Sequence, residues 1–357
     1  MIFIPRADLR ARESGAALIA VLFVIAVLTL VLATTAMLVR SDAELATTQK
    51  KAFRATQVAE MGIAIAANPV VKKTDLQLLN QTLPDGDSFS VRIKGEGGKF
   101  NINTLIQAAK TDPASEGRNF LEVVLAAMGI IDNDQRGLIV DNLVNWTDED
   151  DIPEGDKDTY EKERYEAEGF FNYPFNRPFY NLSEVLLVRG MEVLPGVCPR
   201  WRDYFTIYSA GKLDVNEANA ELLAVASLPD VRAAQTFYEQ QFEAAEDGRD
   251  PSHRIEEAGE VIEMRWGADG MEDTDDDEKL DVATVATSLG LETELANARL
   301  TNQDTTTRIE CTATVGDFRK RIVLVLRNRS NNPQILVREE VPLFDRPPPT
   351  DTPLHSY

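Results

Sequence analysis

An uncharged apolar segment near the N-terminus is the feature that most constrains this chain. Between Ala16 and Val39 no residue is charged, and three threonines are the only polar side chains. As a helix, these 24 residues would extend about 36 Å at a rise of ~1.5 Å per residue, which is enough to cross a hydrocarbon core of about 30 Å. We therefore expect a helix that crosses a membrane once. The basic leader before it, with Arg6, Arg10 and Arg12, favours a cytoplasmic N-terminus and the rest of the chain on the other side.

The helical pattern continues past the apolar segment. Small and apolar side chains recur at steps of three and four residues as far as Ile65, between charged positions, and Asn68-Pro69 then ends the pattern. We expect one helix from about Ala16 to Ala67. A coiled-coil stalk fits this helix less well, because most side chains of the stripe are alanine or similarly small.

The rest of the chain changes from strand to helix and back to strand. Alternating segments at 88–94 and 99–104, with three glycines between them, predict a hairpin. Helical periodicity then dominates for about 170 residues. Alternation returns at 308–315 and 318–326, joined by a turn at Gly316-Asp317, and 335–341 adds another expected strand. A helical block is thus inserted between two groups of strands.

Composition excludes several classes of function. The 357 residues carry a net charge of −22, which disfavours nucleic acid as a partner, because binding phosphates needs a local excess of Lys and Arg. With two histidines, and no recognisable nucleophile, phosphate-loop or zinc motif, no catalytic constellation is present, and we expect no enzyme. Cys198 and Cys311 could form one disulfide or stay as two free thiols; the sequence leaves both open.

Two short windows hold most of the negative charge. The window from Asp141 to Glu163 has a net charge of −8, and that from Asp269 to Asp281 has −7. In the first, several carboxylates lie just past the end of a predicted helix, and others return after Gly155, so they can converge on a hard cation with oxygen ligands. The candidate ligands are Asp148, Asp150, Asp151, Asp156 and Asp158.

The second window supports a weaker prediction. Its candidate ligands are Asp273, Asp275 and Asp277, at alternate positions. The glycine and the closing glutamate of an EF-hand are absent. A second calcium site and a solvated acidic loop are equally compatible with this pattern, and a solvated loop is also the alternative for the first window.

The leader resembles the class III signal of type IV pilins and type II secretion pseudopilins. Its residues Glu13-Ser14-Gly15 stand directly before the apolar helix. The resemblance implies that a prepilin peptidase cuts after Gly15 and that Ala16 becomes the N-methylated N-terminus. Most such proteins carry Glu at the fifth mature position, where this chain has Ala20; its absence there is typical of one minor pseudopilin.

Motifs along the soluble part resemble that same minor pseudopilin family, general secretion pathway protein K of the type II secretion system. They occur in the family's order and are Lys99 to Leu105, Asn145 to Asp151, Gly155 to Tyr160, Pro174 to Phe179, Leu182 to Met191 and Gly211 to Ala218. In the family the first acidic loop binds calcium, so the resemblance implies one or two calcium ions here. Asn145 and Lys157 depart from the family pattern, which has Asp and Glu there.

The implied fold is α+β. A pilin-like long N-terminal helix packs on a small antiparallel sheet that carries a large inserted all-α domain, SAM-like or helix-hairpin-helix-like. The expected parts are a leader (1–15), the transmembrane and stalk helix (16–67), strands (68–104), the helical insertion (105–290, with subdomains at about 105–205 and 211–290), C-terminal strands (291–341) and a Pro-rich tail (342–357).

The implied function is assembly at the tip of the type II secretion pseudopilus. The expected partners are other minor pseudopilins of the I and J types, the pseudopilus, the prepilin peptidase and the bacterial inner membrane, with the C-terminal part in the periplasm and no nucleic acid bound. A type IV pilus minor pilin or adhesin with a calcium-stabilised head is the alternative. A DNA-uptake receptor is disfavoured, because the expected hairpin at Ser227–Val231 has no glycine and carries an acid at its tip.

Overall fold

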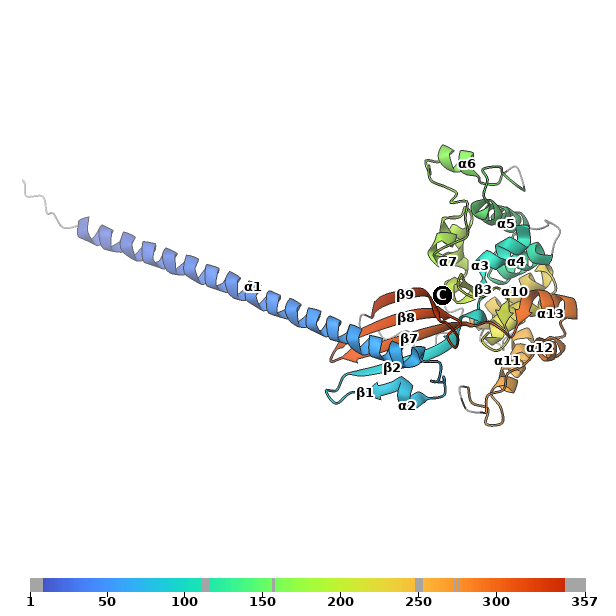
Figure 1. Cartoon of the computed structure of the whole chain (residues 1–357). Helices are drawn as coiled ribbons and strands as arrows, with labels where there is room; N and C mark the ends of the chain where they lie inside the picture. Colours follow the sequence, from blue (N-terminus) through green and yellow to red (C-terminus); the bar gives the residue numbers. More distant parts are fainter. Residues whose placement is uncertain are drawn as a thin grey trace, which may run out of the picture.

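A single long helix projects from an otherwise compact molecule in the computed structural model, which describes residues 9–110, 116–155, 158–247, 253–272, 274 and 276–343 (Figure 1). This helix, α1, runs from Leu9 to Ala67, so the expected single helix is confirmed and already includes the end of the leader. Every residue from Leu18 to Lys50 is exposed, and this part contains a stretch long and apolar enough to cross a membrane.

The second half of α1 packs on a five-stranded antiparallel sheet of order β1-β2-β7-β8-β9. Its strands are β1 (Asn80–Thr82), β2 (Ser88–Gly95), β7 (Thr306–Val315), β8 (Phe318–Arg327) and β9 (Gln334–Leu343), with the short helix α2 (Leu76–Leu79) before β1. The three expected C-terminal strands are therefore present. β9 extends two residues into the expected Pro-rich tail, whose residues 344–357 lie outside the described part of the chain.

The core of this pilin-like body lies between α1 and one face of the sheet. Ala55, Val58 and Ala59 of α1 form one buried cluster with side chains such as Phe89 of β2 and Ile322 of β8. Because side chains of a strand alternate between its two faces, the alternation noted in the sequence supplies this apolar layer. The opposite face carries mainly polar members of β2 and β7, together with the buried Val323 and Val325 of β8.

The hairpin expected between 88–94 and 99–104 is wrong. β2 pairs with β7 over its whole length, from Ser88 opposite Thr314 to Gly95 opposite Thr307. The glycine-rich segment is instead a 3-10 turn, η1 (Glu96–Gly98), after which β3 (Phe100–Asn101) pairs in parallel with β4 (Phe205–Thr206) in a separate two-stranded sheet. Local alternation identified β2 but not its partner, because pairing between segments far apart in the chain leaves no mark in a short window. The expected strand at 99–104 is wrong beyond Asn101, since Ile102 begins α3.

The described residues between β2 and β7 form a largely helical head at the end of the sheet far from the start of α1 (Figure 1). Its helices are α3 (Ile102–Lys110), α4 (Glu116–Ala127), α5 (Asn133–Thr147), α6 (Lys162–Ala167), α7 (Leu194–Val197), α8 (Trp201–Tyr204), α9 (Ala220–Ser227), α10 (Val231–Asp247), α11 (His253–Arg265), α12 (Val282–Ser288) and α13 (Thr293–Arg299), with 3-10 turns η2 (Leu182–Leu187) and η3 (Met191–Val193). A second parallel pair joins β5 (Leu213–Asp214) to β6 (Leu300–Thr301).

One continuous hydrophobic core runs through the head. The cluster contains Phe100, Trp146, Leu223, Val261 and Leu300, and so includes side chains from both expected subdomains. Two local expectations need correction. The segment from Leu182 is a 3-10 turn rather than an α-helix, and residues 293–299, placed among the C-terminal strands, form α13. The α+β class with a pilin-like helix and sheet is confirmed.

Candidate functional site

The first acidic loop follows α5 and is held by two asparagines of that helix. Asn145 Nδ2 donates to the carbonyl of Glu154 (3.3 Å), and Asn145 Oδ1 accepts from the amide of Glu154 (3.2 Å). Asn142 Oδ1 accepts from the amide of Tyr160 (2.7 Å) at the far end of the loop. An aspartate at 145 could not donate, so the departure from the family pattern here supports a structural clamp of the loop.

A glycine allows the loop to return close to α5. Gly155 has a φ of +92°, a conformation that glycine adopts without strain. A Cβ at this position would collide with the carboxyl group of Asp141, which pairs with Arg118 Nη1 at 2.6 Å. The two halves of the acidic loop are thereby brought to the same side of α5.

Asp148 is the buried acid of the predicted ligand set. Its side chain is 6% exposed, and Oδ1 has no hydrogen-bond partner. Burial, reinforced by the charges of Asp150 and Glu154 and opposed by Lys110, raises the pKa of Asp148 to about 6. A buried carboxylate oxygen without a donor is costly unless a proton or a cation satisfies it.

Glu161 is a second buried acid in the same place, and it was not among the predicted ligands. It caps α6, where Oε2 accepts from the amide of Lys162 (2.9 Å), while Oε1 has no hydrogen-bond partner and the residue is 3% exposed. Burial raises its pKa to about 7, with further contributions from Asp148, Asp151 and Asp150. The only sequence signal was its place in the acidic window from Asp141 to Glu163, which it shares with exposed acids.

The other predicted ligands of this loop lie at the surface. Asp151 pairs with Lys162 Nζ and accepts from Asn176 Nδ2, each at 2.9 Å, and the hydrogen bond from Lys162 lowers its pKa. Asp150 Oδ1 accepts from the amide of Ile152 (2.8 Å), and Asp158 lies 3.5 Å from Arg164 Nη2. Asp156 lies outside the described residues.

The loop therefore fits a hard cation only in part. No three acidic, histidine or cysteine side chains of the described residues stand close enough together to hold a metal ion. However, Asp148 and Glu161 each have a buried carboxylate oxygen that accepts no hydrogen bond from the described residues, and the charge of Asp148 acts on Glu161. Carboxylates are among the ligands that calcium prefers. The donor set fits a cation at these two residues better than at the paired Asp151.

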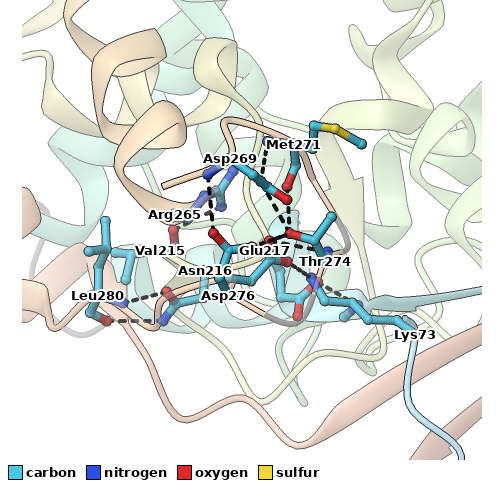
Figure 2. A network of polar contacts seen from close by, with 12 residues as sticks. Lys73, Val215, Asn216, Glu217, Arg265, Asp269, Met271, Thr274, Asp276 and Leu280 are labelled. Atoms are coloured by element: carbon cyan, nitrogen blue, oxygen red, sulfur yellow. Dashed lines mark hydrogen bonds and ion pairs between the residues drawn. The ribbon is translucent and has the colours of Figure 1, made fainter. Parts of the chain in front are cut away.

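One carboxylate of the second acidic loop, that of Asp276, is satisfied within the loop by two backbone amides and a threonine hydroxyl. Figure 2 shows Asp276, Thr274 and Asp269 turned toward one another. Asp276 Oδ2 accepts from the amides of Ala268 (2.9 Å) and Asp269 (3.1 Å), and Oδ1 accepts from Thr274 Oγ1 (2.7 Å). These hydrogen bonds lower the pKa of Asp276, and the one from Thr274 has the largest effect. A carboxylate with three donors needs no metal ion.

Asp277 links this loop to the pilin-like body. Its Oδ2 lies 3.1 Å from Lys73 Nζ, on the segment after α1, and Lys73 and Thr274 line a pocket of about 440 Å³ between body and head (Figure 2). Of the three ligands predicted here, Asp273 and Asp275 lie outside the described residues. The described part of the loop is thus better suited to bridging body and head than to binding calcium.

The predicted processing site lies within α1. Gly15 and Ala16 are helical in backbone, directly before the exposed apolar part of the helix. Cleavage between them stays a prediction. Of the two states left open for the cysteines, the structure has the free thiols: Cys198 and Cys311 are both unpaired, and Cys311 is buried under α1.

Comparisons with known proteins agree with the resemblance drawn from the motifs. Residues 98–208 match the family model described as type II secretion system, protein K. Type II secretion system protein K of Pseudomonas aeruginosa is 31% identical over 147 residues, which are 40% of this chain and 41% of that protein. The matched region thus spans about two fifths of the length of this curated relative.

A solved structure shows a similar fold. The crystal structure of the GspK-GspI-GspJ complex from the type 2 secretion system of enterotoxigenic Escherichia coli contains a chain that superposes with a TM-score of 0.54. The superposition covers 84% of this chain and 98% of that chain, at 13% identity. The resemblance to protein K is confirmed in sequence for part of the head and in fold for most of the chain.

Proposed function

We propose that this chain is a minor pseudopilin of the type II secretion system, of the protein K type, and that it forms the tip of the pseudopilus. The observation that carries the proposal is the position of the head. The chain leaves the sheet at Gly95 and re-enters it at Thr306, and Gly95 pairs directly with Thr307. The whole head therefore stands on one end of a pilin-like body whose stalk helix projects from the other end (Figure 1).

The position of the head supports a capping role. The turn between β7 and β8 lies beside the membrane-proximal part of the soluble stalk, because Lys51 Nζ pairs with Asp317 Oδ1 (2.5 Å). The opposite end of the sheet, which carries the head, points away from the apolar half of α1. A subunit of this shape leaves no room for a further subunit stacked above its own sheet, while its stalk stays accessible to subunits added below.

The stalk provides membrane insertion and assembly. The apolar half of α1 crosses the inner membrane, with the leader in the cytoplasm and the head in the periplasm. Prepilin peptidase removes the leader after Gly15, which makes Ala16 the N-terminus. With Ala20 at the fifth mature position, the subunit offers no carboxylate to the amine of a subunit above it, which agrees with a terminal position.

The partners we infer are other minor pseudopilins of the I and J types. The fold neighbour was solved as a complex of GspK with GspI and GspJ. In this chain the side chains of α1 from Leu18 to Lys50 are exposed over 33 residues, which leaves a long helix surface for the stalks of such subunits. The proposed role of this chain is therefore in assembling the pseudopilus and not in catalysing a reaction.

Calcium binding in the first acidic loop is part of the proposal. Asp148 and Glu161 would hold the ion, joined by loop carbonyls and the nearby surface carboxylates. The ion would neutralise two buried acids and so stabilise the long loop between α5 and α6. The second loop, with Asp277 paired to Lys73, has weaker support as a calcium site.

Deletion of the gene from its bacterium tests the function. We expect proteins normally released through type II secretion to accumulate in the periplasm, and expression of the full chain to restore their release. The matched control is a strain complemented with the Gly15→Val variant, which blocks leader cleavage and should not restore release. Normal secretion with loss of surface pili would instead support the type IV pilus alternative, and normal secretion and normal pili would contradict both.

A further inference from the structure

We propose that the sheet face turned away from α1 is a docking surface for an acidic surface of a neighbouring pseudopilin. We name it the basic sheet face; it consists of Arg92, Lys94, Arg319 and Arg321. The inference rests on the proposed function, because it requires a neighbouring subunit beside the sheet. It adds which surface that neighbour contacts and what charge the neighbour presents.

The strand register defines the face. Residues directly opposite in antiparallel strands point to the same side of the sheet. Ser90, Thr312 and Arg321 form one row across β2, β7 and β8, and Thr314 lies opposite Arg319 in the next row. The alternate row contains Val91 and Ile322, which pack against α1, so the basic rows lie on the opposite side.

Acidic side chains balance these four cations only in part: Glu310 lies directly opposite Arg92, and Glu339 stands in the same row of this face. Arg92 and Lys94 are exposed, and neither they nor Arg319 makes a hydrogen bond or ion pair within the described part of the chain. Arg321 Nε donates only to Thr312 Oγ1 (3.4 Å). In contrast, Arg308 on the same face is neutralised by Glu310 (2.7 Å) and Glu96 (3.4 Å). With Glu310 and Glu339 counted, this face of the sheet still carries more basic than acidic side chains.

The face is unusual in a protein of this charge. Residues 105–299, which form most of the head, contain 17 basic and 43 acidic side chains, whereas residues 50–104 and 300–343, which form the pilin-like body, contain 15 basic and 10 acidic ones. Although the net charge of the chain is −22, its head is strongly acidic and its pilin-like body is basic. Opposite charge on a partner increases both the rate and the specificity of docking.

A pocket extends the basic sheet face toward the head. It has a volume of about 520 Å³ and lies between β2 and the junction of body and head. Besides Arg92 and Lys94 it is lined by Lys99, whose Nζ donates to the carbonyl of Arg202 (2.9 Å), and by Arg200, which pairs with Asp203. Arg308 and the acids Glu96, Asp203, Glu217 and Glu310 also line this pocket, so its charge is mixed and the four cations of the sheet face carry the inference.

A membrane surface fits this face less well than a protein. Arg319 stands two residues after Asp317, which pairs with Lys51, and Lys51 follows the end of the apolar segment at Val39 by 12 residues. Twelve helical residues extend about 18 Å, which is about two Debye lengths at physiological salt. Over this distance salt largely screens the attraction between Arg319 and an anionic membrane surface. The other three cations lie on the same face of the sheet, which is the side opposite the stalk helix α1.

Copurification of the full chain with co-expressed minor pseudopilins, in detergent, tests the inference. The variants are R92E/K94E and R319E/R321E, and the matched control is R232E/K279E, which reverses two cations of the head. We expect each variant of the basic sheet face to lower the amount of copurified partner about tenfold, since like charges at an interface are strongly unfavourable. The control should copurify as the unaltered chain does, and raising the salt should weaken the unaltered complex.

The outcomes separate this inference from the proposed function. If the unaltered chain recovers no minor pseudopilin, the proposed function fails. If it recovers them and both variants do so equally well, the basic sheet face is not the docking surface. Thermal unfolding of each variant checks that its fold is retained. If one of the two variants is unstable, the result for the other decides. Binding of the unaltered chain to anionic vesicles through these four residues would overturn the assignment to a protein partner.

Discussion

Gly62 of α1 lies directly against Cys311 of β7. A Cβ at position 62 would stand 2.6 Å from Cys311 Sγ, 2.9 Å from a ring carbon of Phe89 and 3.0 Å from a methyl group of Val91. Real side chains do not approach this closely, so only glycine lets the stalk helix lie on the sheet at this depth. The contact sets how stalk and body are joined, and thereby the direction in which the head points.

Gly62→Val should separate helix and sheet. We expect a loss of about 2 to 3 kcal/mol in the free energy of unfolding, because the added methyl groups overpack a close interface. Gly137→Ala in α5 is the control, since a Cβ added there would meet open space, and it should be neutral or slightly stabilising. Thermal unfolding of the full chain in detergent measures both, and equal melting temperatures would contradict the close contact.

Calcium should stabilise the protein through Asp148 and Glu161. At a calcium concentration of 100 times the Kd, a bound ion adds about 2.7 kcal/mol, so a chelator should lower the melting temperature and calcium should restore it. Glu161→Gln and Asp148→Asn should each abolish this response. Glu163→Gln, at an exposed residue of α6 outside the candidate ligand set, is the control and should keep it. An unchanged response in Glu161→Gln would remove this residue from the site.

The calcium-free protein should become more stable as the pH falls from about 8 to 5. Burial raises the pKa of Asp148 to about 6 and that of Glu161 to about 7, above the values of unfolded chains. Between about pH 8 and 5 the folded state therefore binds more protons than the unfolded state. The free energy of unfolding rises as these protons bind and falls again as the pH increases through the two raised pKa values, about 6 and about 7. The double variant D148N/E161Q should flatten the profile in chelator. A profile of the unaltered chain that is already flat would contradict the raised pKa values.

Arg299 should stabilise the region where α4, α9 and the β5–β6 pair meet. The residue is 2% exposed, and its guanidinium donates to the carbonyls of Ala226 (3.0 Å) and Leu228 (2.6 Å) and to Glu116 Oε1 (2.8 Å). Arg299→Met leaves two carbonyls without donors, at an expected cost of about 3 kcal/mol. Arg232→Met, at an exposed residue of α10, should change the unfolding free energy by less than about 0.5 kcal/mol. Denaturant unfolding of both variants measures the difference, and equal midpoints would contradict the role of Arg299.

The sequence predicted the candidate site less completely than the fold. The windows of acidic residues were visible as charge, but charge alone did not distinguish Asp148, which is buried, from Asp151, which pairs with Lys162. Glu161 has the same side chain as its exposed neighbours, and only its burial beside Asp148 makes it a candidate ligand. Burial and the positions of neighbouring charges depend on how α5 and α6 pack, which no local pattern encodes.

What the sequence determined by itself is local. The apolar run and the three- and four-residue steps to Ala67 specify α1, and the alternation around Gly316-Asp317 specifies the β7–β8 hairpin, because helix and strand periods and tight turns are properties of short segments. The tertiary structure decided that β2 pairs with β7 rather than with the segment after Gly98, that Lys73 meets Asp277, and that Arg92, Lys94, Arg319 and Arg321 lie on one sheet face. These depend on contacts between distant residues, whose free energy comes from burial and desolvation in the assembled fold.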